Sequence, residues 1–109
     1  MGHPNSPSIS LTLLQISSIK DEIGNKTNVI KTKKEVVGIT RSITQNEYQT
    51  SIQMKVTFDL KVILQCFLYD GSKYAGIDGV IYKIERTYVN GQYIELYLSS
   101  TDIEVIDNG

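Results

Sequence analysis

The sequence predicts a small, mainly β domain, an antiparallel β-barrel or sandwich of five to six strands with one short helix between the second and third strands. Apolar residues recur at every second position in several segments, which is the period of a half-buried strand. Asp-Gly and Asn-Gly pairs mark tight turns after such segments. A single segment carries a helix-start pattern. The chain has 109 residues, enough for one domain with a modest core.

The first two strands are predicted on either side of a turn at Gly24-Asn25. Residues 8–16 alternate apolar and polar side chains, so one face of this strand is expected to be buried. Residues 29–39 are rich in β-branched residues and lysines. That composition suits a strand with a solvated face or an exposed edge.

After the second strand the pattern changes to that of a helix. Thr44 and Glu47 have the spacing of a capping box, in which each side chain caps a free backbone N–H of the other residue. Ile43 and Tyr48 are spaced to form the accompanying hydrophobic staple. Tyr48 and Ile52 are four residues apart and would share one helix face. A short helix is therefore predicted before the third strand.

The second half of the chain is again strand-like. Residues 60–69 place apolar side chains on one face and Lys61 on the other, and they form the most core-like strand of the sequence. Asp70-Gly71 ends this strand with a turn, and a weaker strand is predicted around Tyr74.

The last hairpin is predicted over residues 77–98, with Asn90-Gly91 as its loop, because both central residues of a type I′ turn need positive φ. This loop would place three favourable pairs opposite one another: Tyr88 with Tyr93, Arg86 with Glu95, and Ile84 with Tyr97. Tyrosine and arginine are enriched at protein interfaces. The candidate interface residues are therefore Arg86, Tyr88, Tyr93 and Glu95.

The ionisable residues form no pattern that indicates catalysis or metal binding. One cysteine and one histidine exclude an intrachain disulfide and a Cys-based zinc site. Cys66 falls on an apolar strand face, where a buried structural thiol is expected. The carboxylates have no calcium-loop spacing, and the glycines form no phosphate-binding loop. We expect no enzyme, no catalytic residue and no metal or cofactor site.

Net charge and hydropathy exclude two kinds of interaction, and the composition divides the chain into three segments. The net charge of −1 excludes strong DNA binding by the monomer. The sequence contains no run of 18 apolar residues, so no transmembrane helix is predicted. We expect a polar leader over residues 1–8, one barrel domain over residues 9–99 and an acidic tail over residues 100–109.

The motifs of this chain follow a recognisable order. The last hairpin carries G-x-x-Y-x-I-x-R-T-Y at residues 79–88 and I-E-L-Y at residues 94–97. Upstream lie D-E-I-G-N at residues 21–25, S-I-T-Q-N-E-Y at residues 42–48 and Y-D-G at residues 69–71. As an ordered set over roughly residues 9–99, they resemble the phage and prophage head–tail joining proteins, also called head-closure or stopper proteins.

The resemblance implies a structural virion protein that forms a ring below the portal or adaptor, closes the DNA channel after packaging and docks the tail. Its partners would be the portal or adaptor protein, tail proteins and further copies of itself, with packaged DNA only as blocked cargo and no membrane. It would occur in the host bacterial cytoplasm during assembly and then in the virion head–tail connector. In better understood stoppers, the loop between the second and third strands closes the channel, and residues 42–59 correspond to it here. The candidate channel-facing or subunit-contact residues are Thr44, Glu47, Tyr48, Ile52 and Met54.

Two alternative functions stay open at this point. A tail-completion or adaptor component would belong to the same connector, but adaptors are expected to be mainly helical. A generic small β-barrel that binds a peptide or nucleic acid would interleave aromatic and cationic residues on one face. Here the lysines gather on the second predicted strand and the tyrosines on the last hairpin, which fits that alternative poorly.

Overall fold

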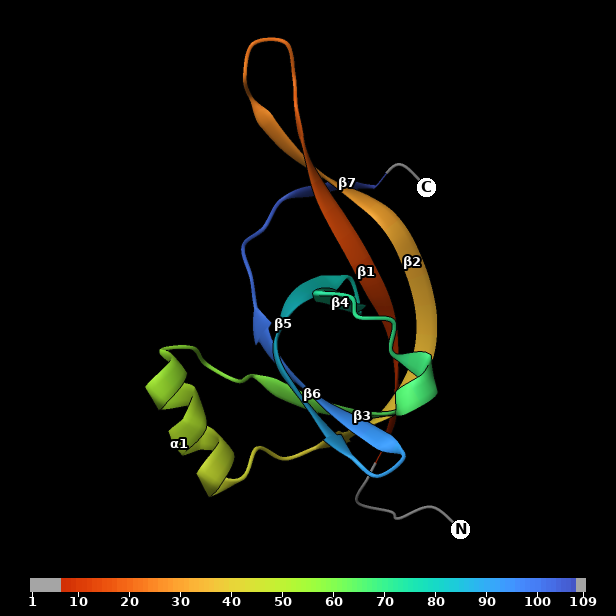
Figure 1. The fold of residues 1–109 in the computed structure, drawn as a ribbon, viewed down its shortest axis with the longest axis vertical. Coiled ribbons are helices and arrows are strands. Elements are labelled where there is room, and N and C mark those ends of the chain that lie inside the picture. The colour runs from red at the N-terminus through yellow and green to blue at the C-terminus, as the bar shows by residue number, and fades with distance from the viewer. Residues whose placement is uncertain (1–6, 108–109) are drawn as a thin grey trace.

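The computed structural model describes residues 7–107 and confirms the predicted mainly β fold with a helix between the second and third strands (Figure 1). The elements in chain order are β1 (Ser8–Lys20), β2 (Lys26–Arg41), α1 (Gln45–Met54), β3 (Leu60–Gln65), the 3-10 helix η1 (Cys66–Leu68), β4 (Tyr74–Ile77), β5 (Val80–Asn90), β6 (Tyr93–Ser100) and β7 (Val105–Asp107). Most of the predicted leader, residues 1–6, lies outside the described residues.

The sheet closes into a barrel. Its strands pair in the order β1-β4-β5-β6-β3-β2, and β1 pairs with β2 as well, so the last strand returns to the first. All of these pairings are antiparallel. The short strand β7, from the acidic tail, adds to β2 in parallel on the outside of this ring.

Alternating side chains from the six barrel strands fill the centre. Leu13, Val62, Leu96 and Leu98 have no exposed surface, and they come from β1, β3 and β6. Because side chains of a strand alternate between its two faces, the predicted period of two buries one set and leaves the other outside.

Gly38 on β2 allows close approach to β3. A Cβ atom built at Gly38 would lie 2.6 Å from Leu64 Cδ2 and 2.7 Å from the Ile63 carbonyl oxygen. Two atoms cannot approach so closely without displacement, and a backbone carbonyl moves at a high cost. The barrel wall therefore requires glycine at this crossing.

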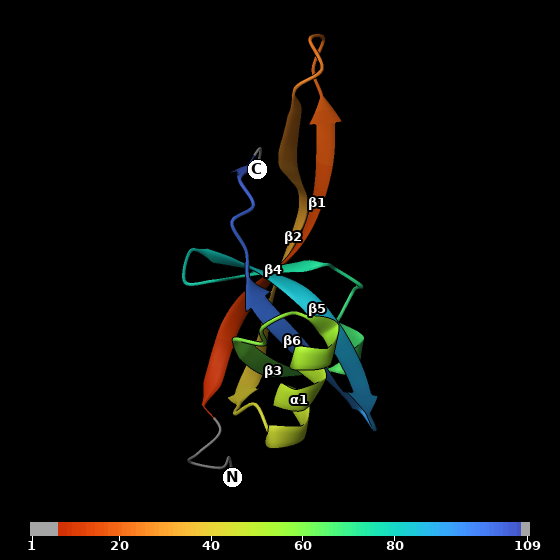
Figure 2. The ribbon, with the colours of Figure 1, turned by 90° about the vertical axis from the view of Figure 1, so that its left-hand side faces the viewer.

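Strands β1 and β2 continue beyond the barrel as an arm, residues 15–31, which projects from it in Figures 1 and 2. Strand β7 pairs with this arm at Asn28–Ile30. Strand β4 pairs with β1 only at Thr12–Leu14, which is where the arm leaves the barrel. The first strand was predicted to end near residue 16, but cross-strand pairing with β2 carries it to Lys20. A register shift between Gln15 and Ile16 marks the foot of the arm.

The predicted loop of the last hairpin is wrong by one residue. Asn90 pairs with Tyr93, so the loop consists of Gly91 and Gln92. Gly91 has a φ of 65°, whereas Asn90 and Gln92 are not among the described residues with positive φ. A glycine at the first loop position is typical of a type II′ turn, which needs positive φ only there.

This loop changes the partners of the candidate interface residues. The observed pairs are Tyr88 with Glu95, Arg86 with Tyr97, and Ile84 with Leu98. The three predicted pairs are therefore wrong. The partners of Tyr88 and Arg86 move by two positions, so these two side chains still share one face of the strand. The partner of Ile84 moves by one position, because the register shifts between Ile84 and Arg86, and Ile84 packs in the core with Leu98.

The predicted strand over residues 60–69 is too long. Strand β3 ends at Gln65, and the chain then turns through η1. The backbone N–H of Cys66 donates to the carbonyl of Gln92 in the β5–β6 loop, at 2.8 Å. Cys66 therefore lies in η1 rather than on a strand, and its partly buried side chain packs against the core.

Candidate functional site

Helix α1 begins at the capping box that the sequence predicts. The Thr44 hydroxyl accepts a hydrogen bond from the Glu47 backbone N–H at 3.2 Å, and the Thr44 backbone N–H donates to Glu47 Oε1 at 2.9 Å. Lys55 ends the helix in the left-handed region with a φ of 60°. Local chemistry thus defines both ends of α1, which lies outside the barrel beside β3 and β6 (Figure 2).

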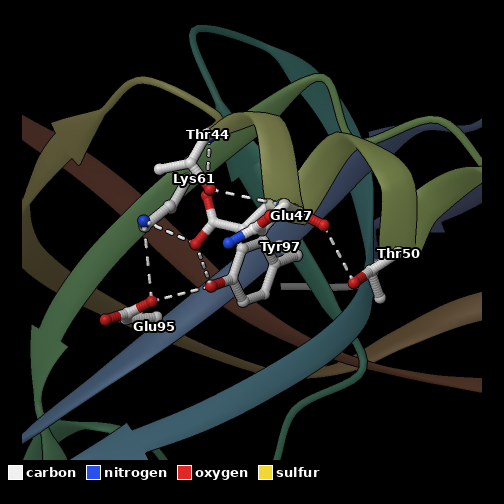
Figure 3. Close-up of polar contacts among 7 residues, drawn as sticks. Thr44, Glu47, Thr50, Lys61, Glu95 and Tyr97 are labelled. Carbon is white, nitrogen blue, oxygen red and sulfur yellow. Dashed lines mark hydrogen bonds and ion pairs between the residues drawn. The ribbon is translucent and has the colours of Figure 1, made fainter.

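A polar cluster formed by Glu47, Lys61, Glu95 and Tyr97 joins α1 to the barrel wall (Figure 3). Lys61 Nζ donates to Glu47 Oε2 at 2.8 Å and lies 3.6 Å from Glu95 Oε1. The Tyr97 hydroxyl lies 2.6 Å from Glu47 Oε2 and 2.7 Å from Glu95 Oε1. One residue from α1, one from β3 and two from β6 therefore share a single hydrogen-bonded network.

The donors of the polar cluster determine how its charges are arranged. A phenol has one proton, so Tyr97 can donate to only one of the two carboxylates at a time. Lys61 carries three donors and reaches both carboxylates. The ammonium group therefore neutralises part of the charge of Glu47 and Glu95, and it is itself only 9 % exposed.

The polar cluster changes the pKa values of two of its members. Burial raises the pKa of Glu47, but hydrogen bonds from Lys61, the Thr44 backbone and Tyr97, together with the charge of Lys61, outweigh it and lower the pKa to about 2. Burial raises the pKa of Tyr97, and its hydrogen bonds to Glu47 and Glu95 raise it further. Glu47 is therefore ionised and Tyr97 protonated near neutral pH.

Aromatic and cationic groups surround the Tyr97 ring. The ring of Phe58 lies 5.0 Å from it between centroids, and the Lys61 Nζ and Arg86 Cζ atoms lie 5.8 and 5.9 Å from its centroid. The distances suit cation–π attraction, which adds to the hydrogen bonds on the phenol oxygen. Every polar group that this cluster uses already has a partner, which suits a structural joint.

A shallow groove of about 470 Å³ lies above the polar cluster. Its lining includes Thr44 and Glu47 from the α1 segment and Arg86, Tyr88 and Glu95 from the last hairpin. These residues were predicted as two separate sites, in the mid-chain loop and in the hairpin. The groove brings them together as one surface.

The remaining candidate residues lie outside this groove on exposed surfaces. On α1, the exposed fractions are 54 % for Tyr48, 53 % for Ile52 and 41 % for Met54. Tyr93 is 47 % exposed and lines a neighbouring groove with Arg41 and Ile63. The face of α1 that carries Tyr48 and Ile52 therefore points to solvent, and Ser51 is the buried residue of the helix.

Sequence reasoning missed Lys61 and Tyr97 as site residues. Lys61 was predicted to face away from the core, and it does alternate with Val62, but that outer face is covered by the Glu47 side chain of α1. Lys61 pairs directly with Tyr97 across β3 and β6. The one sequence signal for this contact is a lysine and a tyrosine on strands that pair. That signal can be recognised only when the register between β3 and β6 is known.

Within residues 7–107, no group of three or more His, Cys, Asp or Glu side chains is arranged to hold a metal ion. None of the helices in the same part of the chain has the length and apolar character needed to cross a membrane. Comparisons of the chain with protein-family models, with curated proteins and with solved structures found no match.

Proposed function

We propose that this chain is a structural subunit of a phage head–tail connector, which forms a ring below the portal or adaptor, closes the DNA channel after packaging and docks the tail. The ordered motifs over residues 9–99, which resemble those of head–tail joining proteins, support this proposal. Residues 42–59, which correspond in that resemblance to the channel-closing loop, lie between β2 and β3 and carry α1.

The outward face of α1 is the observation that carries the proposal. Tyr48 and Ile52 are four residues apart on the same face of this short helix, and each is more than half exposed. Met54 is a further exposed apolar side chain on another side of the helix. Neighbouring exposed apolar side chains such as Tyr48 and Ile52 are typical of protein contact sites. The helix lies in the segment that corresponds to the channel-closing loop of the stoppers, so in a ring it would face the axis or a neighbouring subunit.

The charge of the chain agrees with a plug for DNA. A protein that neutralises many phosphates binds DNA strongly through counterion release. Such contacts would oppose ejection of the genome, whereas a closure needs only to block it. A net charge of −1 fits that requirement.

Electron micrographs of an induced phage lysate from a strain that lacks this gene test the proposal. We expect free tails beside tailless heads that have lost their DNA. Intact, tailed, DNA-filled particles would contradict a head-closure role and would favour a peptide- or nucleic-acid-binding module.

Complementation of the same strain tests the surface of α1. We expect Ile52→Ser to fail to restore tailed particles, because it removes an exposed apolar contact without opening the core. Val89→Ser is the matched control, since Val89 is 60 % exposed on β5 and faces the opposite side of the strand from Tyr88. Equal thermal stability of both purified variants would exclude a folding defect. Full restoration by Ile52→Ser would contradict the assignment of α1 as the contact surface.

A further inference from the structure

Strand β1 has an open edge along the arm. Strand β2 lies between two strands there, because it pairs with β1 on one side and with β7 at Asn28–Ile30 on the other. Strand β4 pairs with β1 only at Thr12–Leu14, so within residues 7–107 no strand other than β2 pairs with residues 15–20. Figure 2 shows β1 on the side of the arm away from β7. Backbone N–H and C=O groups along this edge are therefore available to a further strand.

Hydrogen bonds within the arm hold this edge in an extended form. At the tip, the Asp21 side-chain Oδ1 accepts hydrogen bonds from the backbone N–H groups of Ile23 at 3.1 Å and Asn25 at 2.8 Å. Closer to the barrel, the Ser18 hydroxyl donates to Asn28 Oδ1 at 2.8 Å across the β1–β2 ladder. The edge is thus preformed, and a strand that pairs with it needs to order little of the arm.

The open edge also lacks the features that usually keep strand edges apart. Native proteins protect exposed edges with charged residues, prolines or bulges. Residues 15–19 contain no charged residue and no proline, and the extra residue at the foot of the arm, Lys31, lies on β2. Ile19 is 51 % exposed on this strand. By contrast, the outer edge of β2 carries Lys31 and Lys34 next to the residues that β7 covers.

We propose that the open edge of β1 pairs with the same edge of a second copy of the chain, antiparallel and about a two-fold axis at Ser18. A residue on such an axis lies opposite itself, so Ser18 faces Ser18, Ser17 faces Ile19, and Ile16 faces Lys20. No like charges face each other in this register, and Ile19 gains a cross-strand neighbour.

The position of β4 determines the register. Centring the pair on Ser17 would place Lys20 beside Leu14, where β4 already occupies the edge of β1. Centring it on Ser18 places Lys20 beside Ile16, which is free on that side, and the apolar stem of the lysine can cover the isoleucine.

The shape of the molecule suits a second copy as the occupant of this edge. The arm projects from the barrel (Figures 1 and 2), so antiparallel pairing places the two barrels at opposite ends of the joined arms. Leu14, where β4 begins to pair, lies roughly 13 Å from Ser18 at a strand rise of about 3.3 Å per residue, which keeps each barrel clear of the axis. The contact uses the open arm edges of both copies, so association stops at two. It goes beyond the proposed ring, because neighbours around a single cyclic axis are not related by a two-fold contact.

Disulfide trapping at the axis tests the contact. Residues directly opposite each other in antiparallel strands have Cα atoms about 4.5 or 5.5 Å apart, within the range of a disulfide. In a Cys66→Ala background, we expect Ser18→Cys to form a linked dimer on oxidation. The matched control is Thr32→Cys, which is also exposed on the arm but lies on β2. Two copies of that position would be separated by both β1 strands, roughly 14 Å, which a disulfide cannot span. The yield for Ser18→Cys should be severalfold higher.

Sedimentation of the purified chain over a series of concentrations, under reducing conditions, supplies a second readout. We expect Ser18→Lys to lower the dimer fraction severalfold, because two lysines would face each other at the axis, and Thr32→Lys to leave it unchanged. An equal mixture of Ser18→Lys and Ser18→Glu chains should restore dimers.

Three results would overturn the proposal: a monomer at every concentration, equal disulfide yields at Ser18 and Thr32, or a dimer that Ser18→Lys does not weaken. The last would favour a different contact surface. Because purified protein is used, the result is independent of the lysate micrographs, and either proposal can fail while the other stands.

Discussion

The substitution Glu47→Gln tests whether the polar cluster holds α1 through charge. Glutamine at this position keeps the capping box with Thr44, because an amide oxygen can accept the same backbone hydrogen bond. It removes the negative charge of the carboxylate, whose Oε2 atom accepts hydrogen bonds from Lys61 and Tyr97. Any change in stability therefore reports the charge of the carboxylate rather than the helix cap.

The magnitude follows from the lowered pKa of Glu47. A pKa that falls from 4.5 in the unfolded chain to about 2 in the folded protein corresponds to about 3 kcal/mol at full strength. The open groove above the carboxylate lets solvent screen it, so we expect a loss of about 1–2 kcal/mol in Glu47→Gln at neutral pH. Because the pKa is lower in the folded protein, this contribution is present above pH 4.5 and is lost as the pH falls toward 2.

Urea unfolding followed by circular dichroism at a series of pH values measures this contribution. We expect the free energies of unfolding of wild type and Glu47→Gln to differ at pH 7 and to converge between pH 4.5 and pH 2. Glu22→Gln is the control, since it removes the same charge from an exposed turn at the arm tip. A difference that stays constant down to pH 2, or no difference at pH 7, would refute the role assigned to the Glu47 charge.

Three further substitutions are predicted to change the free energy of unfolding, measured in the same urea experiments. Gly38→Ala should destabilise by about 1–3 kcal/mol through overpacking, whereas Gly76→Ala, whose Cβ would lie 3.6 Å from the nearest side-chain atom, should be neutral or slightly stabilising. Gly91→Ala should cost about 1–2 kcal/mol at its positive φ and Asn90→Ala much less; equal costs would favour the Asn90-Gly91 loop. Thr44→Ala should cost about 1 kcal/mol through loss of the helix cap, and an unchanged free energy would contradict that role.

Local patterns predict the elements of this fold well, because each depends on residues near in sequence. The capping box of α1 needs only Thr44 and Glu47, three residues apart, and it forms as expected. The alternation in the first strand likewise predicts that Leu11 and Leu13 face the core. Strand ends are less predictable, since β1 extends to Lys20 only because β2 pairs with it along the arm.

The candidate site depends on contacts between distant residues, and sequence patterns give less information about those. Asn-Gly predicts a hairpin, but its loop is offset by one residue because only Gly91 takes positive φ. That offset changes the partner of Arg86 from Glu95 to Tyr97. Glu47 and Lys61 are 14 residues apart and meet only after α1 packs on the barrel. Register and helix placement are therefore the steps that the sequence left undetermined.

Helix α1 is attached to the barrel mainly through polar contacts rather than through burial of its apolar side chains. Ser51 is the buried residue of the helix, so burial of apolar side chains contributes little to holding α1 in place. The polar cluster, the caps and the packing of Phe58 on Tyr97 hold it instead. The arm tip is organised in the same way, with Asp21 ordering the turn while Ile23 stays exposed. In both elements polar contacts fix the backbone and leave apolar side chains available, so changes to those side chains should alter association while the barrel core remains intact.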